Sequence, residues 1–165
     1  MRIVCDLDGT LIGERLAPNG EVYVRPRPGI HEFLEKLSRR GHRLVLWTAA
    51  NAAWVRTVRG YFPALMSFFR EIYTDDTLPA IDRARGYPRF FKNIYRVNGD
   101  VLIDNEPAFK LQAEQDGFGH RYILVPTFEP GKPDDSKRRL PEILKYIEQL
   151  RTSPDTLRLG FYFAG

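Results

Sequence analysis

The chain has 165 residues, of which 43% are hydrophobic, and no shift in composition divides it, so we expect one domain with a buried core. The net charge of +4 and the isoelectric point near 9.3 favour anionic partners, and a single cysteine, Cys5, excludes an intramolecular disulfide. The sequence shows no signal peptide and no membrane-spanning apolar stretch, so we expect a cytoplasmic protein without a membrane partner.

The hydrophobic pattern predicts alternating strands and helices. Residues 2–5 are a short β-branched run that predicts a buried strand, and an irregular Gly- and Pro-rich segment follows at 13–29. Helices are then predicted over 30–37, through 54–58, over 107–116 and over 140–150. Further strands are predicted at 42–48, 71–74, 101–103 and 122–125. This alternation is typical of an α/β domain with a parallel sheet.

Two carboxylates separated by one residue follow the first predicted strand. Asp6 and Asp8 should therefore lie at the carboxyl end of a parallel strand, where open α/β sheets bind ligands. Two close carboxylates repel each other, and Mg²⁺ prefers such hard oxygen ligands and bridges them to phosphate. The alternative is a turn or a helix-capping pair of aspartates; Gly9-Thr10-Leu11 and the preceding strand favour a functional site.

These residues resemble the first motif of the haloacid-dehalogenase-like (HAD) phosphatase superfamily, a DxDx(T/V) run after the first strand. Asp6, Asp8 and Thr10 match it. The resemblance implies that Asp6 attacks phosphorus to form an aspartyl-phosphate, and that Asp8 acts as general acid and then as base for the hydrolytic water. It also implies a Rossmann-like three-layer sandwich around a central, mostly parallel five-stranded sheet.

The second and third motifs of the superfamily have candidates in the expected order. Thr48 ends the second long strand, and its hydroxyl, with the backbone N–H groups from Ala49 onward, would hold a phosphoryl oxygen. Lys92 precedes the fourth strand and would neutralise the nucleophile and bind the phosphoryl group. The alternatives are a capping threonine and a solvated lysine, and only the order of the motifs along the chain favours a site.

The fourth motif supplies acidic metal ligands at the end of the fourth strand. Asp104 and Asn105 stand there, and the resemblance implies a Mg²⁺ site formed with Asp6 and Asp8. An isolated Asp-Asn pair is more often a turn.

Several segments are similar to one subgroup, the NLI-interacting-factor type, which is related to the small phosphatases of the RNA polymerase II C-terminal domain. They are Arg25-Pro26-Arg27-Pro28-Gly29, Trp47-Thr48-Ala49-Ala50, Asp104-Asn105 and residues 125–135. The subgroup usually has Glu where this chain has Gly9.

The resemblance also bears on the substrate, because a large cap encloses small substrates in this superfamily. Residues 13–29 are too short for a folded cap and 61–91 form a small insertion, so we expect an essentially capless site open to a macromolecule such as a phosphoprotein. A nucleic-acid end is the second choice, since Tyr87-Pro88-Arg89-Phe90-Phe91 could stack on bases. A nucleotide or small-metabolite phosphatase and a non-catalytic phosphate-binding scaffold are the rival hypotheses.

Three smaller expectations complete the sequence-based picture. Arginine clusters, Arg25/Arg27 and Arg138/Arg139 among them, are expected to face solvent. Cys5 is expected to be a small buried side chain without a chemical role. The apolar tail, about 152–165, is expected to dock on this domain.

Overall fold

A single parallel sheet organises the molecule, whose computed structural model describes residues 1–77 and 92–152. The sheet has five strands in the order β5-β4-β1-β6-β7, and every neighbouring pair is parallel. The strands are β1 (Arg2–Cys5), β4 (Arg43–Trp47), β5 (Glu71–Tyr73), β6 (Val101–Asp104) and β7 (Tyr122–Leu124). The predicted α/β fold with a parallel five-stranded sheet is confirmed.

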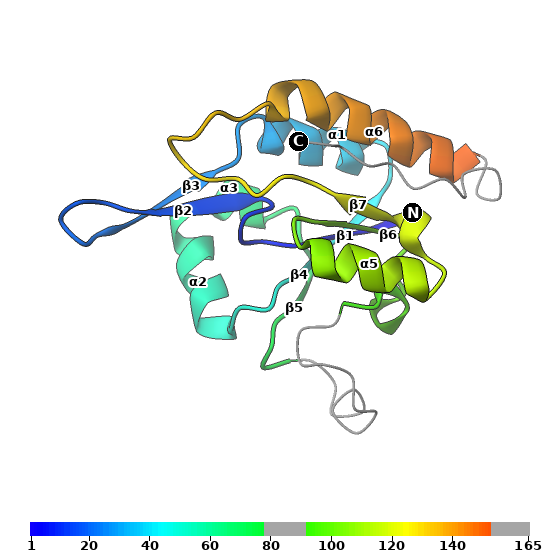
Figure 1. The fold of residues 1–165 in the computed structure, drawn as a ribbon, viewed down its shortest axis with the longest axis horizontal. Helices are drawn as coiled ribbons and strands as arrows, with labels where there is room; N and C mark the ends of the chain where they lie inside the picture. The colour runs from blue at the N-terminus through cyan, green and yellow to red at the C-terminus, as the bar shows by residue number, and fades with distance from the viewer. Residues whose placement is uncertain (78–91, 153–165) are drawn as a thin grey trace.

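Alternating side chains of the strands build a separate core on each face of the sheet, because successive residues of a strand point to opposite faces. Ile3 and Cys5 belong to one core and Val4 to the other. Helices cover both faces and complete the three layers (Figure 1). The first core includes residues of α1 (Ile30–Arg39), α2 (Ala52–Tyr61), α3 (Pro63–Met66) and α6 (Ser136–Thr152). The second includes residues of α5 (Pro107–Gln115) and the 3₁₀ turn η1 (Ile94–Val97).

The prediction that residues 13–29 are irregular is wrong, because most of this segment forms an antiparallel hairpin. Strands β2 (Ile12–Leu16) and β3 (Val22–Pro26) pair with each other and project from the body of the molecule (Figure 1). From Glu14 onward both strands are largely exposed, so they lack the apolar run that marks a buried strand.

Helix α6 begins a turn earlier than the predicted 140–150. Its first residue, Ser136, donates its backbone N–H to Asp134 Oδ2 at 3.3 Å and its hydroxyl to Asp134 Oδ1 at 2.6 Å, so the aspartate fixes the start of the helix. Pro141 lies inside the helix, where it lacks one backbone donor. Within the two described ranges, no helix combines the length and apolar character that crossing a bilayer requires.

Part of the expected insertion at 61–91 belongs to the fold itself, since α3 and β5 lie within it. The remaining stretch, 78–91, which includes Tyr87-Pro88-Arg89-Phe90-Phe91, lies outside the described residues, as does the tail at 153–165. Cys5 is fully buried, as expected, and burial raises the pKa of its thiol.

Candidate active site

Strand order brings three of the predicted site residues to neighbouring positions. Strand β1 lies between β4 and β6, so the residues at the carboxyl ends of these strands share one edge of the sheet. Asp6 directly follows β1, Thr48 directly follows β4, and Asp104 ends β6. All three side chains are buried. Parallel pairing of the strands therefore brings these three residues together, although they are far apart in the sequence.

Lys92 joins two of these strand ends. Its ammonium Nζ donates to Asp6 Oδ1 at 2.5 Å and to Asp104 Oδ2 at 2.8 Å. The three side chains are nearly inaccessible, and Lys92 itself is 4% exposed. Two buried carboxylates thus share one ammonium, which leaves a surplus negative charge at the carboxyl edge of the sheet.

The pKa values of this cluster follow from burial and charge. Burial raises the pKa of Asp6 to about 6, and Asp104 adds to this rise while Lys92 opposes it. Burial alone would lower the pKa of Lys92, but the two carboxylates outweigh it, and the pKa lies above its ordinary value. The ammonium therefore stays protonated, and further positive charge near Asp6 would favour its ionised, nucleophilic form.

The second aspartate of the motif turns toward β4 and α2. Asp8 Oδ1 accepts a hydrogen bond from the indole Nε1 of Trp54 at 2.8 Å, and Oδ2 accepts one from the Thr48 hydroxyl at 3.2 Å. The Thr48 hydroxyl also accepts the backbone N–H of Ala50 at 3.0 Å, and the intervening Ala49 is exposed. The sequence analysis missed this role of Trp54, because it placed the residue only within a predicted helix through 54–58.

Gly9 occupies a position that a side chain would not fit. Its φ is +77°, and a Cβ there would lie 2.7 Å from the Nδ2 atom of Asn105. Asn105 is itself fixed, since its Oδ1 accepts from the Thr10 hydroxyl and its Nδ2 donates to Thr127 Oγ1, each at 3.0 Å. A side chain at position 9 would therefore take a left-handed backbone conformation and would require Asn105 to move.

The donor set at this edge fits a Mg²⁺ ion in charge and in ligand type. Asp6 and Asn105 offer oxygens from neighbouring strand ends, and the surplus negative charge calls for a cation. All four predicted ligands, which include Asp8 and Asp104, hydrogen-bond to other side chains, and no three His, Cys, Asp or Glu residues within 1–77 and 92–152 converge as a metal cluster. Mg²⁺ is commonly held by one or two carboxylates together with waters and substrate phosphate. Asp6 and Asn105 could therefore hold it.

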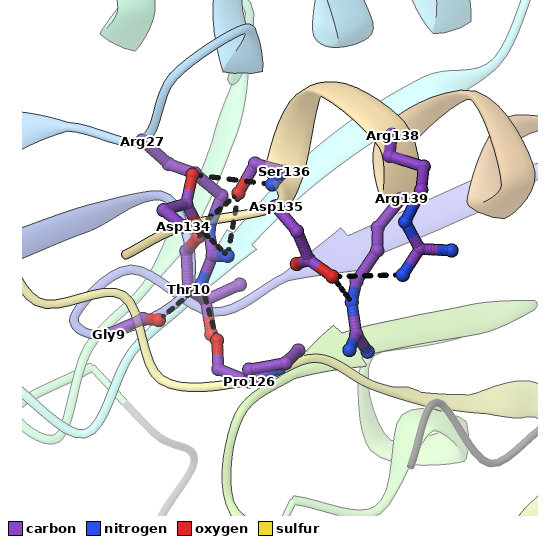
Figure 2. Close-up of polar contacts among 9 residues, drawn as sticks. All are labelled: Gly9, Thr10, Arg27, Pro126, Asp134, Asp135, Ser136, Arg138 and Arg139. Atoms are coloured by element: carbon purple, nitrogen blue, oxygen red, sulfur yellow. Dashed lines mark hydrogen bonds and ion pairs between the residues drawn. The ribbon is translucent and has the colours of Figure 1, made fainter. Parts of the chain in front are cut away.

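A buried arginine clamps the loop that carries these residues (Figure 2). Arg27 is 5% exposed, and its Nε donates to Thr10 O at 2.6 Å. Its Nη2 donates to Gly9 O at 2.8 Å and to Pro126 O at 2.6 Å. One guanidinium therefore ties the loop after β1 to the loop after β7.

The remaining donors of Arg27 reach the start of α6. Its Nη1 donates to Ser136 Oγ at 3.0 Å and lies 3.5 Å from Asp134 Oδ1. The expectation that the Arg25/Arg27 and Arg138/Arg139 clusters face solvent is therefore wrong for one member of each, since Arg139 is also buried and bonds to Asp135 (Figure 2). Burial of an arginine follows from tertiary partners, which its neighbours in the sequence do not indicate.

Comparisons with known proteins identify the family of the chain and similar folds. The family model described as NLI interacting factor-like phosphatase matches residues 1–158. Fission yeast RNA polymerase II CTD phosphatase Fcp1, in a variant bound to beryllium fluoride, is similar with a TM-score of 0.56 and 16% identity over 93% of this chain. A Thermotoga maritima protein assigned as a β-phosphoglucomutase is similar with a TM-score of 0.53 and 12% identity, covering 90% of this chain and 99% of that one. No individually curated protein matches the sequence.

The match covers only part of each of the two similar Fcp1 structures. For the beryllium fluoride complex, the match covers 52% of the Fcp1 chain. A second Fcp1 structure is similar with a TM-score of 0.53 and 17% identity, and that match covers 91% of this chain and 48% of the Fcp1 chain. The chain thus spans about half the length of these Fcp1 proteins. At such identities the likeness shows the shared fold.

Proposed function

The chain belongs to the NLI interacting factor-like phosphatase family, whose fold is HAD-like, and from this premise we propose that it hydrolyses phosphate monoesters with Asp6 as nucleophile. The observation that carries the proposal is the buried contact of Lys92 with Asp6 and Asp104. Asp6 lies two residues before Asp8, and the strand that precedes it is paired with the strand that ends before Thr48. A nucleophile, an ammonium and an acid–base carboxylate then surround one position at the sheet edge.

The reaction proceeds in two steps on these side chains. The Asp6 carboxylate attacks phosphorus while Asp8 gives a proton to the departing oxygen, which leaves as an alcohol. Asp8, now ionised, takes a proton from water as that water attacks the aspartyl-phosphate, so phosphate departs and Asp6 is restored. The Thr48 hydroxyl and the backbone N–H of Ala49 hold a phosphoryl oxygen, and Lys92 offsets its charge.

A Mg²⁺ ion held by Asp6 and Asn105 would neutralise charge on the phosphoryl oxygens. The two carboxylates that share the single ammonium of Lys92 support this ion. Asn105 is placed for the task by its bonds to Thr10 and Thr127.

The substrate that we propose is an accessible phosphorylated segment of a protein. Between β1 and α1 the chain inserts only the β2–β3 hairpin, which is two strands and no folded cap. Fcp1, which shares the fold, is a phosphatase of the RNA polymerase II CTD. Phosphopeptides, nucleotides, small metabolite phosphates and oligonucleotides with 3′ or 5′ phosphates should be compared by kcat/KM, and a preference for the small esters would overturn this assignment.

Hydrolysis of p-nitrophenyl phosphate with Mg²⁺ tests the chemistry. Asp6→Asn should lower kcat by about a thousandfold or more, because the amide is not a nucleophile. Asp100→Asn is the matched control, since Asp100 lies at the opposite end of β6 and accepts the backbone N–H of Arg2 at 2.7 Å. If the wild type and both variants show only the uncatalysed rate, the chain is a phosphate-binding scaffold instead of an enzyme, and if Asp6→Asn keeps a wild-type rate above that background, Asp6 is not the nucleophile.

A further inference from the structure

Trp54 reaches the candidate site from the first turn of α2. The helix begins at Ala52, and the Asn51 side chain caps it by accepting the backbone N–H of Trp54 itself at 2.9 Å. The Asp76 carboxylate accepts the N–H of Ala52 at 2.6 Å. These two bonds fix the backbone from which the half-buried indole extends to Asp8 Oδ1.

The two hydrogen-bond donors on Asp8 differ in kind. An indole N–H can only donate, so the oxygen that it contacts, Oδ1, must be an acceptor. The Thr48 hydroxyl, at 3.2 Å from Oδ2, can donate or accept, so Oδ2 can be bare or carry a proton. The pair of contacts therefore makes the two oxygens of Asp8 unequal and sets the rotation of the carboxyl group.

We propose that Trp54 is a positioning residue for proton transfer by Asp8, and that its indole N–H turns Oδ2 toward the departing oxygen. This inference rests on the proposed function, because it assigns the general acid role to Asp8. The hydrogen bond of its indole to Asp8 links Trp54 to the proposed reaction, so its effect is expected to pass through the Asp8 carboxyl.

A misplaced general acid has a distinctive kinetic signature. A good leaving group such as p-nitrophenolate departs with little help from a proton, whereas a basic one such as phenolate depends on it. Trp54→Phe keeps an aromatic ring and deletes the N–H. The loss in kcat/KM, which reports the first chemical step, should therefore grow with the basicity of the leaving group.

The experiment measures kcat/KM for a series of aryl phosphates with Mg²⁺. Trp54→Phe should lower it by roughly a hundredfold for phenyl phosphate and by less than about tenfold for p-nitrophenyl phosphate. The control is Trp47→Phe, the same change at the chain's other tryptophan, which lies buried in the core of the opposite face and should show no dependence on the leaving group. A loss for Trp54→Phe that is equal across the series, or no loss, overturns the inference.

A second measurement does not depend on activity. With only two tryptophans, the ¹⁵N-labelled protein gives two indole N–H signals in NMR, and the two Phe variants assign them. Asp8→Ala should shift the Trp54 signal upfield and speed its exchange with water, while the Trp47 signal stays in place. An unmoved Trp54 signal overturns the contact.

The two levels of the proposal fail differently. If the wild type hydrolyses none of the aryl phosphates, the proposed function fails, whatever the NMR signals show. If the wild type is active and Asp6→Asn is not, while Trp54→Phe loses the same factor on every substrate, only the role of Trp54 fails.

Discussion

Two buried lysines stand near opposite edges of the sheet, and their surroundings differ. Lys92, at the carboxyl edge, donates to the Asp6 and Asp104 carboxylates. Lys110 of α5 donates to the carbonyls of Gly119 at 2.5 Å and of Tyr122 at 3.2 Å, where β7 begins, and its Nζ lies 3.6 Å from the partly exposed carboxylate of Glu114. Burial acts to lower the pKa of both, but the carboxylates bring the pKa of Lys92 above its ordinary value, whereas that of Lys110 lies below it.

The difference shows at which edge of the sheet buried charges of like sign lie close together. At the amino edge, buried charge meets neutral carbonyls or a partner that is partly open to water, as in the pair of Arg2 with Glu71. At the carboxyl edge, like charges are held together at a cost in stability that is compatible with a site built for chemistry. Matched substitutions at the two edges should therefore differ in their effects on the free energy of unfolding and on activity.

Lys92→Met should have the largest effect, because it leaves Asp6 and Asp104 as buried carboxylates without a cation. The free energy of unfolding should fall by about 3–5 kcal/mol, with loss of phosphatase activity. Lys110→Met leaves carbonyls without a donor, so it should cost about 1–3 kcal/mol and keep the turnover of the folded enzyme. Urea unfolding and aryl phosphate assays measure both, and equal loss of activity in the two variants would contradict the contrast.

Arg27→Ala should have the next largest effect, because it removes the donors to Gly9, Thr10 and Pro126. We expect the free energy of unfolding to fall by about 3 kcal/mol, since several buried carbonyls lose their partner. Arg2→Ala, at the amino edge, should cost about 1 kcal/mol, because Glu71 is 37% exposed and can be hydrated. Urea unfolding of both variants is the measurement, and a larger loss for Arg2→Ala would contradict the comparison.

Two glycines with the same backbone conformation allow a finer test. Gly9 has φ +77° and Gly41 has φ +79°, but a Cβ at Gly41 meets nothing within 4 Å. Gly41→Ala should therefore lower the free energy of unfolding by about 1 kcal/mol, because alanine must adopt the left-handed conformation. Gly9→Ala should lower it by about 2 kcal/mol, because the new Cβ must also displace Asn105. Thermal unfolding measures the costs, and a raised Mg²⁺ requirement only in Gly9→Ala would report the displacement. Equal behaviour of the two variants counts against the close packing at Gly9.

The smallest expected effect concerns pH. The bidentate bond with Arg2 lowers the pKa of Glu71 below its ordinary value of 4.5, so the folded state favours the ionised form. This stabilisation is present above pH 4.5 and is lost as the pH falls through the folded-state pKa. Glu71→Gln should remove less than about 1 kcal/mol of the wild-type difference in unfolding free energy between pH 7 and pH 3.5. An unchanged difference would mean that the ion pair contributes nothing.

The sequence by itself determined the five strands of the central sheet, the helices α1, α2, α5 and α6, and the residues at the strand ends. The apolar run ending at Asp6, the one ending at Thr48 and the one ending at Asp104 are local patterns, and local backbone preferences carry them into the structure. The alternation of strands and helices then required a parallel sheet with its carboxyl ends at one edge, and the order of the motifs agreed with this topology.

Only the tertiary structure decided which partner each polar side chain has. The strand order places Asp6 between Thr48 and Asp104, and the fold turns Asp8 toward Trp54 and buries Arg27 against carbonyls far away in the sequence. Hydrogen-bond partners depend on the register and packing of segments separated by tens of residues, and no local period records them. For the same reason the sequence did not predict the exposed hairpin. Its two strands are held by pairing with each other, and neither contains a continuous apolar run.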